Sequence, residues 1–340
     1  MTETKITITA VIPAYNVGQY IARAIESVLA QTHPANEIIV VDDGSSDNTV
    51  EVVRCYGDKV RLVQQANGGA SAARNTGINA AASDWIAFLD ADDEWLPNML
   101  QLQTDILRQY PDMVWTTGNY KRCFCRRGYM LIQEDEKHLQ PLLDNKPYFP
   151  DYFDAFVHKV RGCTNCMVIR KDVLLELGCF CTLLPKANDI DMWFRIAYRY
   201  PQIGFVAEPL SIYHMETGDS LASHHMDCDY LKQFLQRHFD LAEDAGRLEQ
   251  FAPCARQMLQ AWIRSGLFDD RVHDIRKMIQ SFSFLLSANY KCTLWLMTIL
   301  PGLTKGIFKT LSRISRTLKL RRQTWHEKSE YKRKETHSSK

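Results

Sequence analysis

The chain has 340 residues, of which 46% are apolar and 24% are charged, an ordinary composition for a globular protein with a sizeable core. Its net charge of +1 is unevenly spread, because residues 305–340 hold twelve Lys or Arg and three Glu, which leaves 29 basic and 37 acidic residues elsewhere. The body is therefore mildly acidic and the C-terminal tail is basic.

No signal peptide or membrane-spanning segment is expected. The first residues lack a basic leader segment, and no apolar run reaches the roughly 18 to 20 residues that span a bilayer. We therefore expect a cytoplasmic chain whose ten cysteines stay reduced. Three cysteine pairs are closely spaced: Cys123/Cys125, Cys163/Cys166 and Cys179/Cys181. Cys163 and Cys166 have the spacing of a zinc knuckle, but their flanks resemble strand and loop, so free thiols are the favoured interpretation.

The first 110 residues alternate between strand and helix patterns. Short apolar strands are predicted at 6–12, 37–41, 60–63 and 85–89. Helices are predicted at 21–29, around 50–53, at 71–82 and after Pro97. This alternation indicates a parallel sheet with helices on both sides. No GxGxxG motif follows the first strand and no Walker A motif is present, which disfavours dinucleotide binding.

The second half is mixed and then helical. A strand at 166–169, a short helix at 173–177 and a helix at 191–200 precede a helical region at 227–288. We expect one domain over 1–225, divided into halves at 1–112 and 113–225, then a helical extension at 226–290.

The last segment, 291–340, is predicted to form a basic amphipathic tail. Apolar residues recur at helical spacing between 307 and 318, interleaved with Lys and Arg, after an aromatic and aliphatic lead-in at 294–300. This composition favours binding to an anionic membrane surface, where each basic residue contributes about 1 kcal/mol. The alternative is a helix that packs on the body. Nucleic-acid binding is disfavoured because no binding module accompanies the tail.

Three polar clusters follow predicted strands: 13–16, 42–46 and 90–93. Ligands of open parallel sheets bind beyond the carboxyl ends of the strands, so these clusters are expected to share one edge. In the third cluster, Asp90, Asp92 and Asp93 repel one another unless a cation is present. Carboxylate oxygens suit Mg²⁺ or Mn²⁺, and the alternative is a polar turn before the next helix.

Other residues at this edge suit a nucleotide. Asp43 is placed to accept a hydrogen bond from a base or ribose. The alternative is a loop cap for the next helix, a role that Ser46 or Asp47 can already fill. Gly68, Gly69 and the helix start that follows favour close approach of phosphates. Arg74 suits a diphosphate, with a solvated surface arginine as the alternative.

The long ordered motifs of residues 5–100 closely resemble the inverting family-2 glycosyltransferases, and residues 163–222 do so more loosely. The motifs are VIPAYNVGQYIARAIESVLAQTHPANEIIVVDDGSSDNT, NGGASAARNTGINAA and WIAFLDADDEWLP. The resemblance implies the GT-A fold, a Rossmann-like, mostly parallel sheet flanked by helices, here with a C-terminal helical extension. Residues 1–112 would then bind the nucleotide and residues 113–225 the acceptor.

The resemblance also implies roles for single residues. Asp92 would bind the metal, Asp90 would lie near the ribose and the ion, and Asp43 would bind the base, most often uracil. The remaining residues of the implied donor site are Pro13, Ala14, Tyr15, Gly68, Arg74 and Asn75. His214 is assigned to the metal site with Asp92, although relatives often carry an arginine there, near the diphosphate.

In the second half, residues 188–193 resemble the family motif Glu-Asp-x-Asp-Leu-Trp. Asp189 fits the general base and Asp191 is the second candidate. Two departures make the acceptor side unusual: Asn188 replaces the usual glutamate, and Gly178-Cys179-Phe180-Cys181 replaces a Gly-Gly-Phe turn that is followed by Asp.

The sequence therefore predicts an Mn²⁺- or Mg²⁺-dependent hexosyl- or N-acetylhexosaminyltransferase, peripheral on the inner face of the cell membrane. Its donor would be a nucleotide-sugar, most readily a UDP-sugar, and its acceptor a saccharide or lipid-linked saccharide of the envelope. Two alternatives stay open. One is a non-catalytic nucleotide-binding scaffold, and the other is a sugar nucleotidyltransferase. The second is disfavoured because such enzymes carry a Gly-rich basic loop after the first strand, and residues 13–16 do not form one.

Overall fold

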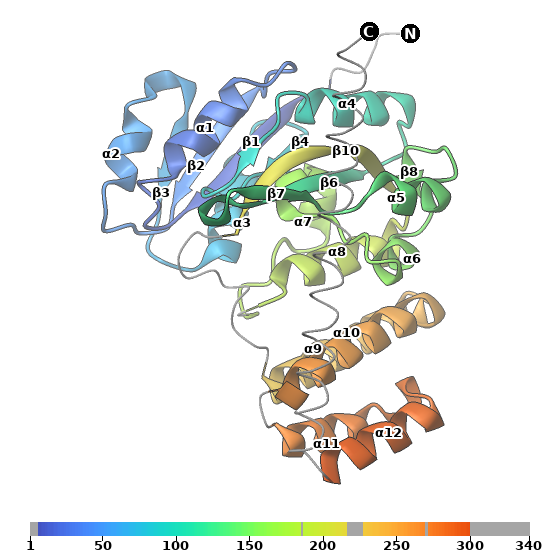
Figure 1. Ribbon diagram of the computed structural model, residues 1–340. Helices are drawn as coiled ribbons and strands as arrows, with labels where there is room; N and C mark the ends of the chain where they lie inside the picture. Colours follow the sequence, from blue (N-terminus) through green and yellow to red (C-terminus); the bar gives the residue numbers. More distant parts are fainter. Residues whose placement is uncertain (1–5, 185, 216–226, 269–270, 300–340) are drawn as a thin grey trace, which may run out of the picture. The chain divides into compact units, whose positions relative to one another are not determined.

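The computed structural model describes residues 6–184, 186–215, 227–268 and 271–299 (Figure 1). The chain divides into two compact units, residues 1–225 with 236–254 and residues 226–235 with 255–340. The boundary between them falls within helices α9 (Cys228–Asp244) and α10 (Leu248–Phe268).

The first unit is built on a sheet with the strand order β3-β2-β1-β4-β9-β6-β10-β5 (Figure 1). Strands β1 to β4 are parallel, as are β6 and β10, whereas β9 and β5 run antiparallel to their neighbours. The strands on this path are β1 (Ile8–Ala14), β2 (Glu37–Asp42), β3 (Arg61–Gln64), β4 (Trp85–Phe88), β5 (Glu94–Trp95), β6 (Trp115–Phe124), β9 (Val168–Arg170) and β10 (Ile203–His214). Two short strands pair at its side: β7 (Tyr129–Ile132) with β6 and β8 (Tyr148–Phe149) with β10.

Eight α-helices are described between β1 and β10 in this unit. They are α1 (Ile21–Leu29), α2 (Thr49–Arg54), α3 (Ala70–Ala80), α4 (Met99–Gln109), α5 (Glu136–Leu143), α6 (Tyr152–Val157), α7 (Lys171–Glu176) and α8 (Asn188–Arg199). Helices α1 to α4, α7 and α8 match predicted helices, whereas α5 and α6 were not predicted. The mixed, mostly parallel α/β architecture is thus confirmed. Boundaries differ by a few residues: β1 runs on to Ala14, and α4 begins at Met99 rather than at Pro97.

Helix α3 packs unusually close to the sheet. A Cβ atom on Gly77 would lie 2.3 Å from Cγ1 of Val11 in β1, so only glycine permits this approach. The close contact brings the first turns of α3, which carry Arg74, beside the carboxyl ends of the parallel strands.

The second unit is helical. It contains α11 (Val272–Ser281) and α12 (Ala288–Ile299), and its buried side chains include Ile275, Met278 and Leu294. No helix among the described residues is long and apolar enough to cross a membrane. Most of the predicted amphipathic tail, residues 300–340, lies outside the described residues.

Candidate functional site

The loops that follow β1 and β2 are tied together at one edge of the sheet. The backbone N–H of Asp43 donates to the carbonyl of Ala14 (2.8 Å), and the Asn16 N–H donates to Ser45 Oγ (2.9 Å). The Asn16 side chain in turn accepts from the Ser46 N–H (2.8 Å). Tyr15, next to Pro13 and Ala14, is 51% exposed, so its side chain is accessible to solvent.

Asp43 organises the glycine loop before α3. Its buried carboxylate accepts hydrogen bonds from the N–H groups of Gly68 (2.9 Å) and Gly69 (2.7 Å) and from Gln65 Nε2 (2.7 Å). Gly69 has φ +84°, a conformation that favours glycine. These bonds use three of the roughly four acceptor positions of a carboxylate. Asp43 therefore shapes the glycine loop before α3 and not the start of the helix that follows it, while its contact with a base or ribose stays a prediction.

Arg74 is a buried partner of the acidic cluster, not a solvated surface arginine. Its Nη2 lies 2.6 Å from Asp90 Oδ1, the side chain is 9% exposed, and its guanidinium lies 5.6 Å from the centre of the Phe180 ring. Asn75, by contrast, holds the turn that contains Phe180: its amide donates to the Phe180 carbonyl (2.8 Å) and accepts from the Phe180 N–H (2.9 Å). The Asn75 amide is thus committed to this turn.

Asp93 is the carboxyl of the acidic cluster that the surrounding residues enclose. It is fully buried and accepts hydrogen bonds from the His214 N–H (2.7 Å) and from Asn165 Nδ2. Burial, followed by the nearby charges of Asp92 and Asp90, raises the pKa of Asp93 to about 8. Asp93 is therefore enclosed and held by two hydrogen bonds, whereas Asp90 and Asp92 are partly exposed.

The donor set of the cluster fits a hard divalent cation. Asp90 and Asp92 offer carboxylate oxygens, which Mg²⁺ and Mn²⁺ prefer. The charges of Asp92 and Asp90 add to the effect of burial on the pKa of Asp93, and a cation at the cluster would offset this repulsion. Asp92 is partly exposed, in contrast to the fully buried Asp93.

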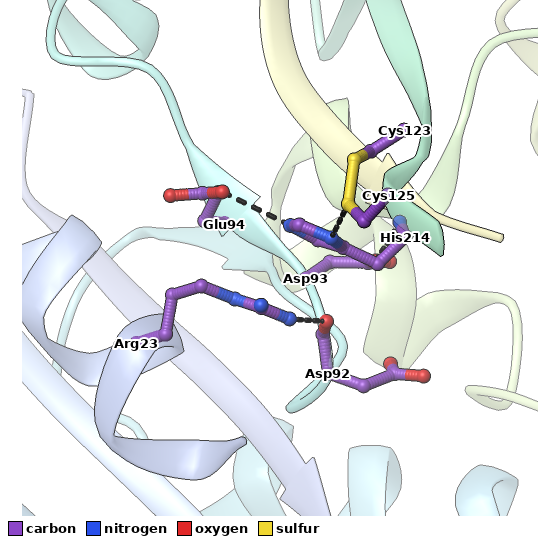
Figure 2. Close-up of a disulfide and its surroundings, with 7 residues drawn as sticks. All are labelled: Arg23, Asp92, Asp93, Glu94, Cys123, Cys125 and His214. Atoms are coloured by element: carbon purple, nitrogen blue, oxygen red, sulfur yellow. Dashed lines mark hydrogen bonds and ion pairs between the residues drawn. A yellow bond between two sulfur atoms is a disulfide. The ribbon is translucent and has the colours of Figure 1, made fainter. Parts of the chain in front are cut away.

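Asn165 and Arg23 belong to this site, although the sequence pattern does not single them out. Asn165 accepts from the Asp90 N–H (2.7 Å) through its side chain and from Trp95 Nε1 (2.7 Å) through its carbonyl. The Arg23 guanidinium donates to the Asp92 carbonyl (Figure 2). Each of these contacts joins residues about 70 positions apart, which leaves no local signal in the sequence.

Asp189 lies in the first turn of α8 and is partly exposed. Burial raises the pKa of this carboxyl, and the charge of Asp90 adds to the effect, while the Ile190 N–H and the charge of Arg74 oppose it. The start of α8 is joined to α3, because Asn188 Nδ2 donates to Ser71 Oγ (2.6 Å). Asp189 is thereby held within electrostatic reach of the Arg74–Asp90 pair.

Asp191 differs sharply from Asp189. It is fully buried, its Oδ2 lies 2.7 Å from Arg195 Nη2, and its Oδ1 lies 3.3 Å from His238 Nε2 and 3.4 Å from Arg237 Nη2. Burial raises the pKa of Asp191, but His238, Arg195 and Arg237 together outweigh it and the net shift is downward. Such a carboxylate anchors α8 and is a poor proton acceptor, which favours Asp189 between the two candidates.

Both ring nitrogens of His214 are engaged away from Asp92. Nε2 lies 2.9 Å from Glu94 Oε1 and Nδ1 lies 3.4 Å from Cys125 Sγ, while the Asp92 carboxylate points away from the ring (Figure 2). Binding of one ion by Asp92 and His214 therefore requires a side-chain rotation.

The expectation that all cysteines are reduced is wrong for one pair. Cys123 and Cys125 form a disulfide next to His214 (Figure 2). The reason is local, since β6 ends at Phe124 and a short 3₁₀ turn over Cys125–Arg127 folds the second sulfur back toward the first.

The Cys163/Cys166 pair does not resemble a zinc site in the structure. Cys166 Sγ lies 3.1 Å from Ser211 Oγ, and burial raises the pKa of its thiol to about 12 and that of Cys163 well above its usual range. Among the described residues, the group that gathers three His, Cys or carboxylate ligands consists of Cys123, Cys125 and His214.

A polar cavity of about 380 Å³ opens between β6, β10 and the loop before Asn165. Its charged lining residues are Arg122, Glu134, Lys159 and Arg161. Gly162, also in its wall, is three residues before Asn165, so the cavity adjoins the segment that supports the acidic cluster.

The architecture and the site together define a GT-A protein. Residues 9–178 match the Glycosyl transferase family 2 model, and the chain belongs to this family. It is 33% identical over 234 residues to an uncharacterized glycosyltransferase of Rickettsia conorii, covering 66% of this chain and 37% of that protein. It is 31% identical over 176 residues to TuaG of Bacillus subtilis, a putative teichuronic acid biosynthesis glycosyltransferase, covering 50% and 65% of the two chains.

The fold matches a solved structure over most of its length. TarS residues 1–349 of S. aureus, solved in complex with UDP-GlcNAc, superpose with a TM-score of 0.67 at 15% identity, covering 88% of each chain. The matched regions span between 33% and 62% of the length of the first five rickettsial relatives.

Proposed function

We propose that this protein is a metal-dependent inverting glycosyltransferase that moves a sugar from a UDP-sugar to a hydroxyl of a cell-envelope or polysaccharide acceptor. The observation that carries the proposal is the juxtaposition of Asp189, a carboxyl with a raised pKa, with the Arg74–Asp90 pair beside Asp92. The UDP-GlcNAc bound to TarS and the envelope polymer named for TuaG support the donor and acceptor classes.

The donor would lie across the ends of β1, β2 and β4. Tyr15 would stack on the base, and Asp43 would use its remaining acceptor position on it. The first turn of α3, at the positive end of the helix dipole, would lie near the phosphates. Asp92 and Asp90 would hold Mn²⁺ or Mg²⁺. His214 would not join them, because its ring nitrogens face Glu94 and Cys125. When bound, that ion neutralises charge on the leaving diphosphate.

Asp189 would act as the general base on the acceptor hydroxyl. Desolvation raises the pKa of its carboxyl and thus its affinity for the proton that the acceptor loses as it attacks the sugar. Attack from the face opposite the diphosphate inverts the anomeric configuration. The polar cavity beside Gly162 would receive the rest of the acceptor, and its cationic lining favours an acceptor with anionic groups.

The donor site is tested by calorimetry of the full chain with UDP, in the presence and absence of Mn²⁺. We expect UDP to bind more tightly with Mn²⁺ and to be preferred over GDP and CDP, because Asp43 and Tyr15 would contact the base. Product formation with UDP-sugars then tests turnover. Metal-enhanced binding without any transfer would favour a scaffold, and no nucleotide binding at all would refute the donor site.

We further propose that the protein binds the inner face of the cell membrane through residues 300–340. The basic excess of this tail supports the proposal, as do two exposed aromatic side chains of the second unit, Phe284 (67%) and Trp295 (63%). Truncation after Ile299, which keeps α12, is expected to abolish binding to anionic phospholipid vesicles in a sedimentation assay while UDP binding persists. Undiminished sedimentation of the truncated chain would contradict the proposal.

A further inference from the structure

We propose that Cys123, Cys125 and His214, with the two cysteines reduced, form a binding site for a thiophilic divalent cation of the zinc class. The potential ligand atoms of the three residues lie within 4.8 Å of one another. The site lies beside the proposed donor-metal cluster and uses different chemistry, because thiolates select zinc over magnesium or manganese.

The backbone holds the three ligands in register. Strands β6 and β10 are parallel and place Cys123 opposite His214, and the Met215 N–H donates to the Cys123 carbonyl (3.0 Å). The turn that carries Cys125 is closed by a bond from the Gly128 N–H to the Cys125 carbonyl (3.1 Å), with Gly128 at φ +71°. The cluster is therefore positioned by sheet and turn hydrogen bonds that do not depend on the disulfide.

The imidazole of His214 is oriented as in a metal site. Its Nε2 is held by the Glu94 carboxylate at 2.9 Å, which leaves Nδ1 directed at Cys125 Sγ, 3.4 Å away (Figure 2). Metal-binding histidines commonly donate their second N–H to a carboxylate in this way. Two ligands on one tetrahedral zinc, with Zn–S near 2.3 Å and Zn–N near 2.0 Å, lie about 3.5 Å apart, which agrees with the observed separation.

The cation binds only after the Cys123–Cys125 disulfide has been reduced. Two thiol equivalents of a reductant convert the disulfide into the Cys123 and Cys125 thiols and become a disulfide themselves. The cation then displaces the two thiol protons and binds two thiolates and the imidazole, with no electron transferred. The fourth tetrahedral position is left for water. Oxidation by a low-molecular-weight disulfide reverses the first step and expels the cation.

The test is a titration of the full-length protein with Co²⁺, a spectroscopic substitute for zinc. The protein is reduced with a phosphine and freed of it without oxygen. We expect a thiolate-to-cobalt charge-transfer absorption that saturates at about one equivalent and disappears when Zn²⁺ is added. Cys123→Ser and Cys125→Ser should each weaken binding at least tenfold, whereas the exposed free thiol Cys55 provides a matched control, so that Cys55→Ser should leave it unchanged.

A second experiment requires no substituted variant. Wild-type protein treated with oxidised glutathione, with the Cys123–Cys125 disulfide verified by mass spectrometry, should lose the absorption and regain it on reduction. An absorption that is absent from the reduced protein, that persists in the Cys123→Ser, Cys125→Ser double variant, or that survives disulfide formation would overturn the proposal. UDP binding with Mn²⁺, measured separately, reports on the donor site, so the two proposals fail independently.

Discussion

Asp189→Asn is expected to lower kcat by about 10²- to 10⁴-fold while leaving the affinity for UDP and Mn²⁺ nearly unchanged. Asparagine keeps the size of the side chain but cannot accept the proton of the acceptor hydroxyl. Steady-state kinetics with a UDP-sugar and an acceptor, together with UDP calorimetry, separate the two effects. Equal losses in kcat and in UDP affinity would indicate that Asp189 supports the donor site instead.

The neighbouring Asp191 provides the matched comparison. Asp191→Asn removes the negative charge that pairs with the Arg195 guanidinium, which leaves this largely buried cation without its charged partner. Breaking such a pair costs about 3 to 5 kcal/mol of folding free energy. We therefore expect a lower thermal midpoint for Asp191→Asn and an unchanged midpoint for Asp189→Asn.

The pH dependence of the activity should also identify Asp189 as the general base. The base acts only when ionised, and burial raises the pKa of Asp189 above its usual value. Activity should therefore be full above this raised pKa and fall as the pH drops through it. In Asp189→Asn the residual rate should lack this acidic limb.

Asp92→Ala is expected to abolish the enhancement of UDP binding by Mn²⁺, with a loss of at least tenfold in affinity in the presence of the metal. The reason is that the family resemblance assigns the metal to Asp92, whose side chain is partly exposed, whereas Asp93 is fully buried. Calorimetry with and without Mn²⁺ measures the change directly.

Two controls test whether the effect of Asp92→Ala is specific to the metal site. Asp58→Ala removes a charge from the exposed turn before β3 and should leave metal-dependent UDP binding intact. Circular dichroism of Asp92→Ala should match that of the wild type. If the alanine variant still binds UDP more tightly with Mn²⁺, the metal lies elsewhere and the assignment of Asp92 fails.

The two halves of the first unit differ in how many of their strands and helices the sequence predicted. Strands β1, β2 and β4 and helix α1 were predictable because their periodicity is local and their ends carry polar residues. Strands β6 and β10 were not, since their register shifts near Pro209 and each finds its partner about 90 residues away. A strand that is specified by distant pairing leaves a weak local pattern.

The functional residues divide in the same way. The sequence by itself determined the family, the parallel α/β core and the cluster at Asp90–Asp93, because ordered motifs and strand ends are local features. Only the tertiary structure separated Asp189 from the anchored Asp191, committed the Asn75 amide to Phe180, and joined Cys123, Cys125 and His214. Those outcomes depend on burial and on contacts between distant segments, which decide the pKa, the partner and the orientation of a side chain after the chain has folded.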